Sequence, residues 1–135
     1  MRVVFVSGCA LIDAQGRVLI AKRPQTKPMA GLWEFPGGKI ESGESPESAL
    51  IRELREELAI DADASSLSPL TFTSHDYDDF HLLMVLYECR KWGGEIKAVE
   101  GQTLRWVEPI RLYDHPMPSA NPPLLPRLVS LLKPR

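Results

Sequence analysis

Apolar and polar residues alternate along the chain in short stretches that predict an α/β protein. Leu50, Leu54 and Leu58 recur at every fourth position within residues 46–58, so they would lie on one face of a helix and pack against a sheet. Runs of β-branched, aromatic and other apolar residues predict strands elsewhere. We expect strands at residues 3–12, 17–22, 32–35, 70–74, 80–87 and 104–107, and a short second helix at 124–132.

Turn-forming residues separate these elements. Asp13–Gly16 lies between the first two predicted strands, so we expect those strands to form a hairpin. Pro24–Ala30 contains two prolines and predicts a loop. Pro36–Gly38 predicts a break in the chain, because proline cannot donate a ladder hydrogen bond and glycine permits backbone angles closed to other residues. Ser45 followed by Pro46 is typical of the start of a helix.

The composition is that of one globular domain. The 135 residues are 44% hydrophobic and 25% charged, which excludes disorder or a coiled coil for the chain as a whole. No repeat or linker divides residues 1–135, so we expect a single domain. The net charge of −2 argues against attachment to a nucleic-acid polymer by bulk charge. A small anionic ligand is compatible with it, because a bound cation supplies the missing positive charge.

The cysteines and the apolar runs bear on the cellular compartment. Cys9 and Cys89 are too few for a disulfide scaffold and belong to no CxxC pair, so we expect two buried, reduced thiols. No apolar run approaches the roughly 18 residues that a membrane-spanning helix needs. The sequence therefore predicts a cytoplasmic protein with no membrane contact.

Three acidic residues share the polar side of the predicted helix. Glu53, Glu56 and Glu57 lie at positions i, i+3 and i+4, so their side chains project from the same part of its surface. Like charges at this spacing destabilise a helix by roughly 0.2–0.5 kcal/mol per pair. One interpretation is a solvated face on which Arg52 and Arg55 partly compensate the charge. The other is a site for cations.

A fourth acid favours the cation site. Glu100 falls in a loop between two predicted strands and has no obvious partner nearby in the sequence. Carboxylates that converge on one point need cations, and hard oxygen ligands select Mg²⁺ or Mn²⁺ over Zn²⁺. Magnesium held by few carboxylates keeps several waters, so it recruits phosphate oxygens and a water nucleophile. The pattern predicts metal-dependent phosphoryl transfer or hydrolysis.

The spacing of these residues resembles the Nudix box, GX5EX7REUXEEXGU, in which U is a bulky aliphatic residue. From Gly38 to Ile60 every defined position matches except the late glycine, which is Ala59 here. The resemblance implies the Nudix fold, a mixed β-sheet sandwiched between helices. It also implies hydrolysis of a nucleoside diphosphate linked to another group, with Mg²⁺ or, as a substitute, Mn²⁺. Ala59 must either adopt the left-handed conformation, at a cost of roughly 1–2 kcal/mol, or end the helix differently.

The resemblance also implies roles for particular residues. Glu53 and Glu100 match residues that act as metal ligand or general base, and the sequence does not divide the two roles between them. Arg52 matches a residue that orients a glutamate through a charge-assisted hydrogen bond. The implied metal ligands are the main-chain carbonyl of Gly38 and the side chains of Glu53, Glu56, Glu57 and Glu100.

Two further segments resemble the MutT-type 8-oxo-dGTP diphosphatases of this family. They are Trp33–Glu41 and Pro118–Pro123, the second of which contains Asn121. Oxidation at C8 turns the N7 acceptor of guanine into a donor beside the O6 acceptor, and an asparagine amide can pair with that edge. Asparagine before proline is also ordinary turn or helix-cap chemistry. The resemblance implies that substrate is bound by Arg23, Phe35, Lys39, Tyr77 and Asn121.

Two other functions remain open. A pyrimidine triphosphate pyrophosphohydrolase acting on CTP or 5-methyl-dCTP shares the sequences at Ala30–Phe35 and Arg52–Leu58, although such relatives tend to lack an asparagine at position 121. A non-catalytic nucleotide sensor on the same fold usually shows losses among the box acids, which are intact here. In each case the expected partner is a small nucleotide, and the protein would be a monomer or a homodimer.

Overall fold

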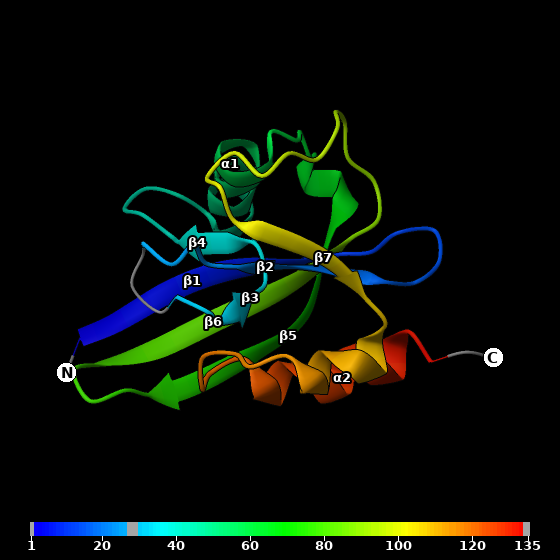
Figure 1. The fold of residues 1–135 in the computed structure, drawn as a ribbon. Coiled ribbons are helices and arrows are strands. Elements are labelled where there is room, and N and C mark those ends of the chain that lie inside the picture. The colour runs from blue at the N-terminus through cyan, green and yellow to red at the C-terminus, as the bar shows by residue number, and fades with distance from the viewer. Residues whose placement is uncertain (1, 27–29, 134–135) are drawn as a thin grey trace.

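Two β-sheets lie between helical layers in the computed structural model, which describes residues 2–26 and 30–133 (Figure 1). The strands are β1 (Arg2–Leu11), β2 (Val18–Lys22), β3 (Trp33–Glu34), β4 (Gly37–Lys39), β5 (Leu67–Asp76), β6 (Phe80–Cys89) and β7 (Thr103–Val107). The helices of the described residues are α1 (Pro46–Leu58), α2 (Leu125–Leu131) and the short 3-10 helices η1 (Ala64–Ser66), η2 (Pro109–Asp114) and η3 (Pro122–Leu124).

The first sheet is mixed and the second is antiparallel. The strand order is β4-β1-β6-β5 in the first sheet, where β1 and β6 are parallel, and β3-β2-β7 in the second. α1 covers one side of the sheets, and η2 with α2 covers the opposite side (Figure 1). The expected arrangement, a mixed sheet sandwiched between helices, is confirmed.

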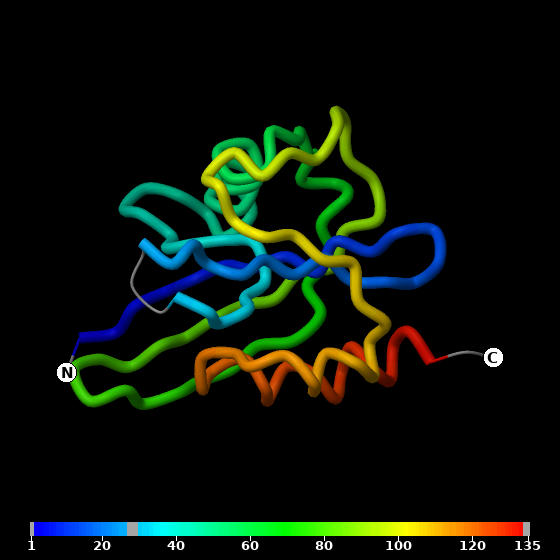
Figure 2. Tube along the Cα trace, in the orientation of Figure 1, coloured from blue at the N-terminus to red at the C-terminus, as the bar shows by residue number. Residues whose placement is uncertain are grey.

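The first two strands are joined by a short loop (Figure 2), but they do not form the predicted hairpin. The turn itself is present, because the Asp13 carboxylate accepts hydrogen bonds from the main-chain N–H groups of Gln15 (3.0 Å) and Arg17 (2.8 Å). Beyond one bridge between Ile12 and Val18, β1 and β2 separate into different sheets. β1 pairs with β6 along its whole length and with β4 on its other edge, which leaves little of that edge for β2.

The predicted break at Pro36–Gly38 is only partly right. β3 and β4 do belong to different sheets, but Gly37 to Lys39 forms β4 and pairs with β1. A Cβ atom on Gly37 would lie 2.2 Å from the carbonyl oxygen of Ser7, and the φ angle of Gly37 is +149°. Glycine at this position therefore permits the close pairing of β4 with β1, because a side chain would not fit.

α1 begins and ends where the sequence predicts, at Pro46 and Leu58. The Ser45 side chain accepts a hydrogen bond from the Ser48 N–H, and the Ser48 hydroxyl accepts one from the Ser45 N–H. The leucines that recur at every fourth position are buried against the sheets. The acidic residues are thereby turned away from the core.

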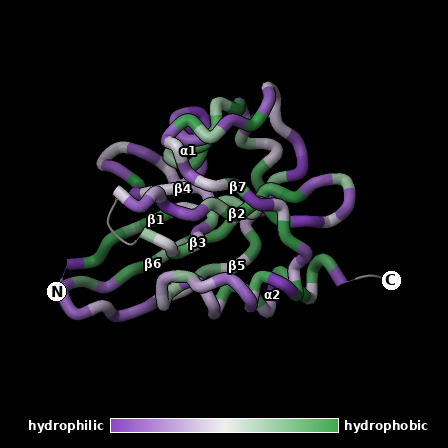
Figure 3. The backbone as a smooth tube through the Cα atoms, viewed as in Figure 1, coloured by the Kyte–Doolittle hydropathy of each residue, from purple (hydrophilic) through white to green (hydrophobic). Residues whose placement is uncertain are grey.

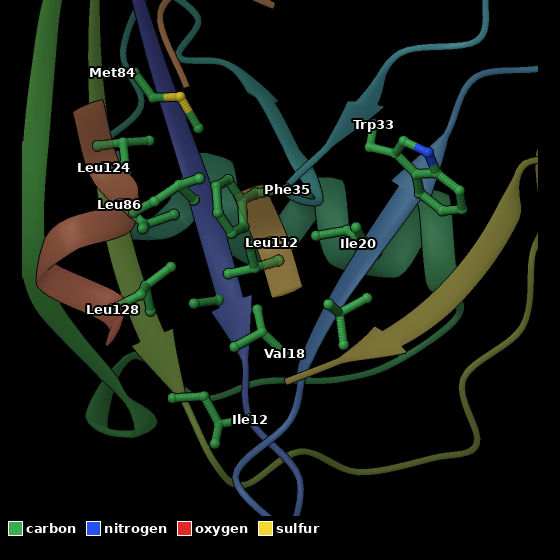
Figure 4. Packing of buried hydrophobic residues seen from close by; sticks show 13 residues of the cluster. Ile12, Val18, Ile20, Trp33, Phe35, Met84, Leu86, Leu112, Leu124 and Leu128 are labelled. Carbon is green, nitrogen blue, oxygen red and sulfur yellow. The ribbon is translucent and has the colours of Figure 1, made fainter. Parts of the chain in front are cut away.

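Buried apolar residues form two clusters, one on each side of the sheets. Alternate residues at the end of β1 contribute to them in turn: Cys9 and Leu11 pack beneath α1, whereas Ala10 packs toward α2, as does Ile12 just after the strand. Figure 4 shows the cluster on the α2 side. Apolar stretches run along the central strands, and polar residues concentrate in the connecting loops (Figure 3).

Two smaller expectations are tested by the same structure. Cys9 and Cys89 are both buried and free, as predicted. Within the described ranges, 2–26 and 30–133, no helix combines the length and the apolar character needed to cross a membrane. Of the predicted loop Pro24–Ala30, residues 24–26 and 30 are free of helix and strand, and residues 27–29 lie outside the described residues.

Ala59 ends α1 in the left-handed conformation, with φ 60° and ψ 32°. It is the single non-glycine residue with positive φ in the part of the chain that the structure describes. The left-handed conformation costs alanine roughly 1–2 kcal/mol, and glycine at this position would remove that cost. Part of the gain in stability would be lost, because glycine also gives the unfolded chain greater freedom. We predict that Ala59→Gly raises the free energy of unfolding by about 0.5–1 kcal/mol, measured by urea denaturation.

The matched control for this substitution is Ala64→Gly. Ala64 is an exposed alanine in η1 whose φ is not positive. Glycine at position 64 only increases the freedom of the unfolded chain, so the Ala64→Gly variant should be slightly less stable than the wild type. A protein with Ala59→Gly that is no more stable than the wild type would show that the helix end is not strained.

Candidate functional site

A cavity of about 340 Å³ opens beside α1, between β4 and the loop that precedes β7. It brings together residues that are far apart in the sequence. Its wall consists of Ala21, Arg23, Pro24, Gly37, Gly38, Lys39, Glu53, Glu57, Glu100 and Gln102. The wall thus contains most of the predicted metal ligands together with two of the predicted substrate contacts.

Glu57 is the acid most affected by this environment. Its Oε2 atom is buried and has no hydrogen-bond partner among the described residues. Burial raises the pKa of the Glu57 carboxyl far above its usual range, and the neighbouring carboxyls of Glu53 and Glu100 raise it further. Among the described residues no basic side chain forms an ion pair with Glu57, and a divalent cation would balance the charge of its ionised carboxylate.

Glu53 packs directly against Gly38. A Cβ atom on residue 38 would lie 2.6 Å from the carboxyl carbon of Glu53. Only glycine leaves room for this carboxylate, which therefore packs closely against the main chain of Gly38. Gly38 lies in β4 and Glu53 in α1, so this contact joins the two elements.

Arg52 holds the acids in place through several bonds. Its guanidinium donates to both carboxylate oxygens of Glu44, at 2.7 and 2.9 Å, and to Glu53 Oε1 at 2.9 Å. The two-pronged bond with Arg52 lowers the pKa of Glu44 to about 2. The Arg52 guanidinium also donates to the carbonyl oxygen of Lys39 at 3.3 Å. Arg52 therefore connects the segment before α1 with the Glu53 carboxylate.

Glu56 lies at the edge of this arrangement. Its side chain is 56% exposed, its Oε2 atom is 3.5 Å from Arg52 Nη1, and it is not part of the cavity wall. Among the described residues, no three acidic, histidine or cysteine side chains are gathered as ligands of one ion. The donors nevertheless suit a hard cation, because they are oxygens and Glu57 has an unpaired buried oxygen.

Phe35 and Asn121 do not line the acidic cavity. Phe35 belongs to the apolar cluster on the α2 side (Figure 4). Asn121, which immediately precedes η3, is only 5% exposed, and its side chain makes no capping hydrogen bond to that helix. The interpretation of Asn121 as a helix cap is therefore not supported.

Tyr77 lies next to the segment that carries Asn121. Its hydroxyl accepts a hydrogen bond from the main-chain N–H of Ala120 at 3.2 Å, and its ring stacks on Phe80 with centroids 5.1 Å apart. Tyr77 thus ties the turn between β5 and β6 to the residue before Asn121. The structure divides the predicted residues into an acidic group beside α1 and a second group that includes Phe35, Tyr77 and Asn121.

Comparison with known proteins identifies the family. The family model of the NUDIX domain matches residues 8–127. This chain belongs to the NUDIX family. The resemblance predicted from the Nudix box is confirmed, and the cavity beside α1 in this NUDIX protein is built around that box.

Named relatives of this NUDIX protein include two kinds of hydrolase. It is 38% identical to the 8-oxo-dGTP diphosphatase of Proteus vulgaris over 96 residues, which cover 71% of this chain and 84% of the relative. It is 37% identical to the CTP pyrophosphohydrolase of Escherichia coli (strain K12) over 124 residues, which cover 90% of this chain and 89% of the relative. A MutT structure from work on Aliivibrio salmonicida and Vibrio cholerae superposes with a TM-score of 0.80 at 30% identity, covering 96% of this chain and 99% of that one.

Gln102 also lines the cavity beside α1, although no role is predicted for it from the sequence. Its amide bonds to the main chains of Glu57 and Glu100. The feature of the sequence that could have pointed to Gln102 as a residue of the site was its position two residues after Glu100. Nothing in the sequence shows that a side chain at this position turns toward α1, because that contact depends on how the loop folds back.

Proposed function

We propose that this NUDIX protein hydrolyses a nucleoside triphosphate to a nucleoside monophosphate and pyrophosphate, with 8-oxo-dGTP as its preferred substrate. One observation carries the hydrolytic part: Glu57, whose Oε2 atom is buried and unpaired among the described residues, lines a cavity together with Glu53, Glu100 and two basic residues, Arg23 and Lys39. Cations and phosphate groups together balance these charges. Such an activity removes an oxidised precursor from the nucleotide pool and so limits mutation.

The donor set fits Mg²⁺, or Mn²⁺ in its place. The residues that would hold it are Gly38, through its main-chain oxygen, and Glu53, Glu56, Glu57 and Glu100. When bound, the cation supplies charge neutralisation for the triphosphate and lowers the pKa of an attacking water. Glu56 would have to turn from its exposed position toward the cavity to take part.

The chain's own residues position the reacting groups. Arg52 orients the Glu53 carboxylate through its 2.9 Å bond. Glu53 or Glu100 accepts the proton of the water that attacks the β-phosphorus, the two being alternative bases. Arg23 and Lys39, both in the cavity wall, bind phosphate oxygens by charge-assisted hydrogen bonds.

We place the recognition of the base outside the acidic cavity. We assign this recognition to Asn121, whose amide can donate to O6 and accept from the N7–H of 8-oxoguanine. Phe35 lines the base, and Tyr77 positions the Asn121 segment through its bond to Ala120. The buried, non-capping side chain of Asn121 supports this assignment.

Pyrimidine triphosphate hydrolysis is the second candidate function. It is favoured by the CTP pyrophosphohydrolase relative, whose match covers 90% of this chain. A nucleotide sensor without activity is disfavoured, because all the box acids are intact and the cavity contains Glu53 and Glu57. The free thiols suit a reducing compartment, so we place the enzyme in the cytoplasm, acting on small nucleotides as a monomer or homodimer.

Steady-state turnover of four nucleotides with Mg²⁺ tests the proposal. We expect kcat/KM for 8-oxo-dGTP to exceed that for dGTP, CTP and 5-methyl-dCTP by about 100-fold or more, with monophosphate and pyrophosphate as products. Preference for either cytosine nucleotide would overturn the purine assignment in favour of the second candidate. Tight binding without release of pyrophosphate would indicate a sensor.

A further inference from the structure

The side chain of Gln102 joins the loop before β7 to the end of α1 by hydrogen bonds. Its Nε2 atom donates to the carbonyl oxygen of Glu57 at 3.0 Å, and its Oε1 atom accepts from the N–H of Glu100 at 2.9 Å. Gln102 is only 9% exposed. Its amide therefore bridges the main chains of two acids of the cavity, although Gln102 and Glu57 are 45 residues apart in the sequence.

The rest of the loop is held to α1 through main-chain bonds that precede Glu100. The N–H groups of Lys97 and Val99 donate to the carbonyl oxygens of Leu58 (2.9 Å) and Glu57 (3.1 Å). These bonds satisfy the last carbonyls of the helix, which otherwise lack partners. Residues 97–101 are exposed, and the loop passes beside the end of α1 (Figure 1). Beyond Val99, the contact with α1 is made by Gln102.

We infer that Gln102 is a positioning residue that fixes the Glu100 carboxylate at the cavity. The inference rests on the proposed hydrolysis, in which Glu100 serves as ligand or base. Only an amide of this length supplies a donor to Glu57 and an acceptor to Glu100 at once. Methionine has a similar shape but supplies neither bond, and asparagine is one methylene too short to span both main chains.

Replacing Gln102 by methionine should release the loop without unfolding the protein. We expect kcat with 8-oxo-dGTP to fall between about 10-fold and 100-fold, with KM changed by less than about twofold, because small misplacements of a reacting group have effects of that size. Gln15→Met is the matched control. Gln15 is exposed in the turn between β1 and β2, so its substitution should leave kcat unchanged.

A double-mutant cycle with Glu100→Gln separates positioning from general damage. If Gln102 acts through Glu100, Gln102→Met should change kcat by less than about twofold in the Glu100→Gln background. A loss of the same size in both backgrounds would overturn the inference and leave the proposed function intact. Should Gln102→Met fail to fold, Gln102→Asn takes its place in the cycle with the same expected outcomes.

Amide hydrogen exchange gives a readout that does not depend on activity. In the wild type the Glu100 N–H donates to Gln102, so its exchange should be slow for an exposed loop. In Gln102→Met we expect it to exchange at least about 10-fold faster, while amides in β1 and β6 keep their protection. Unchanged exchange at Glu100 would overturn the inference even if the enzyme hydrolysed none of the nucleotides tested.

Discussion

Replacing Glu57 by glutamine is expected to lower the turnover of 8-oxo-dGTP by roughly 10³-fold or more while the protein still folds. Glutamine keeps the shape of the side chain and removes its charge. Of the acids in the cavity wall, Glu57 is the one with an unpaired buried oxygen among the described residues, so it contributes most directly to holding a cation. Because catalysis at such a site consists largely of neutralising phosphate charge, its loss should appear in kcat.

The control for this substitution is Glu108→Gln. Glu108 is an exposed acid beside η2 and is not in the wall of the acidic cavity. Its turnover should stay within about twofold of the wild type. Initial rates of pyrophosphate release at several Mg²⁺ concentrations would provide the comparison. Near-normal activity of Glu57→Gln at saturating Mg²⁺ would contradict the role given to Glu57.

The same substitution should stabilise the protein in metal-free buffer. The pKa of Glu57 is raised in the folded state, so folding disfavours its charged form. The resulting destabilisation is absent below the unfolded pKa and grows as the pH rises from there toward the folded pKa. In the presence of a chelator, the melting temperature of the Glu57→Gln variant should therefore be higher than that of the wild type at pH 8. That advantage should shrink toward pH 5.

Replacing Asn121 by alanine is expected to reduce the preference for 8-oxo-dGTP over dGTP by roughly 100-fold or more, with kcat for dGTP largely retained. The amide is buried and does not cap η3, so its loss leaves the donor and acceptor of the oxidised base edge unpaired. The phosphate end of the site is built from other residues. The effect should therefore fall on selectivity rather than on hydrolysis.

Ser119→Ala is the neighbouring control for the Asn121 substitution. Ser119 is exposed two residues before Asn121, so its removal should leave the ratio of kcat/KM values unchanged. Asn121→Asp adds a second comparison, because it keeps an acceptor for N7–H and loses the donor to O6. An Asn121→Ala enzyme with undiminished preference for the oxidised nucleotide would show that another residue reads the base.

Local signals in the sequence predicted the helix of the site well. Ser45 and Pro46 mark the start of α1, and the leucine repeat sets its buried face. The side of the helix from which the glutamates project follows from these two features. These signals act within one or two turns of the helix. The pairing of strands depends instead on segments that are distant in the sequence, and β1 pairs with β6 and β4 rather than with its neighbour β2.

Strand limits were harder to predict where edge strands tolerate proline. β5 begins at Leu67, three residues before the predicted start, and passes Pro69 with an irregular register. An edge strand has unpaired groups on one side, so the missing N–H of proline costs little there. The exposed position of Glu56 and the inward turn of Gln102 also depend on tertiary contacts that residue spacing does not describe.

Anomalous diffraction from crystals grown with Mn²⁺ and the monophosphate of 8-oxo-deoxyguanosine tests the central claim, that the acids beside α1 form a divalent-cation site. The account predicts a manganese peak within about 2.0–2.6 Å of a Glu57 carboxylate oxygen, with the main-chain oxygen of Gly38 as a neighbour. A crystal in which the nucleotide is bound and the manganese lies away from Glu57, or is absent from the cavity, would contradict it.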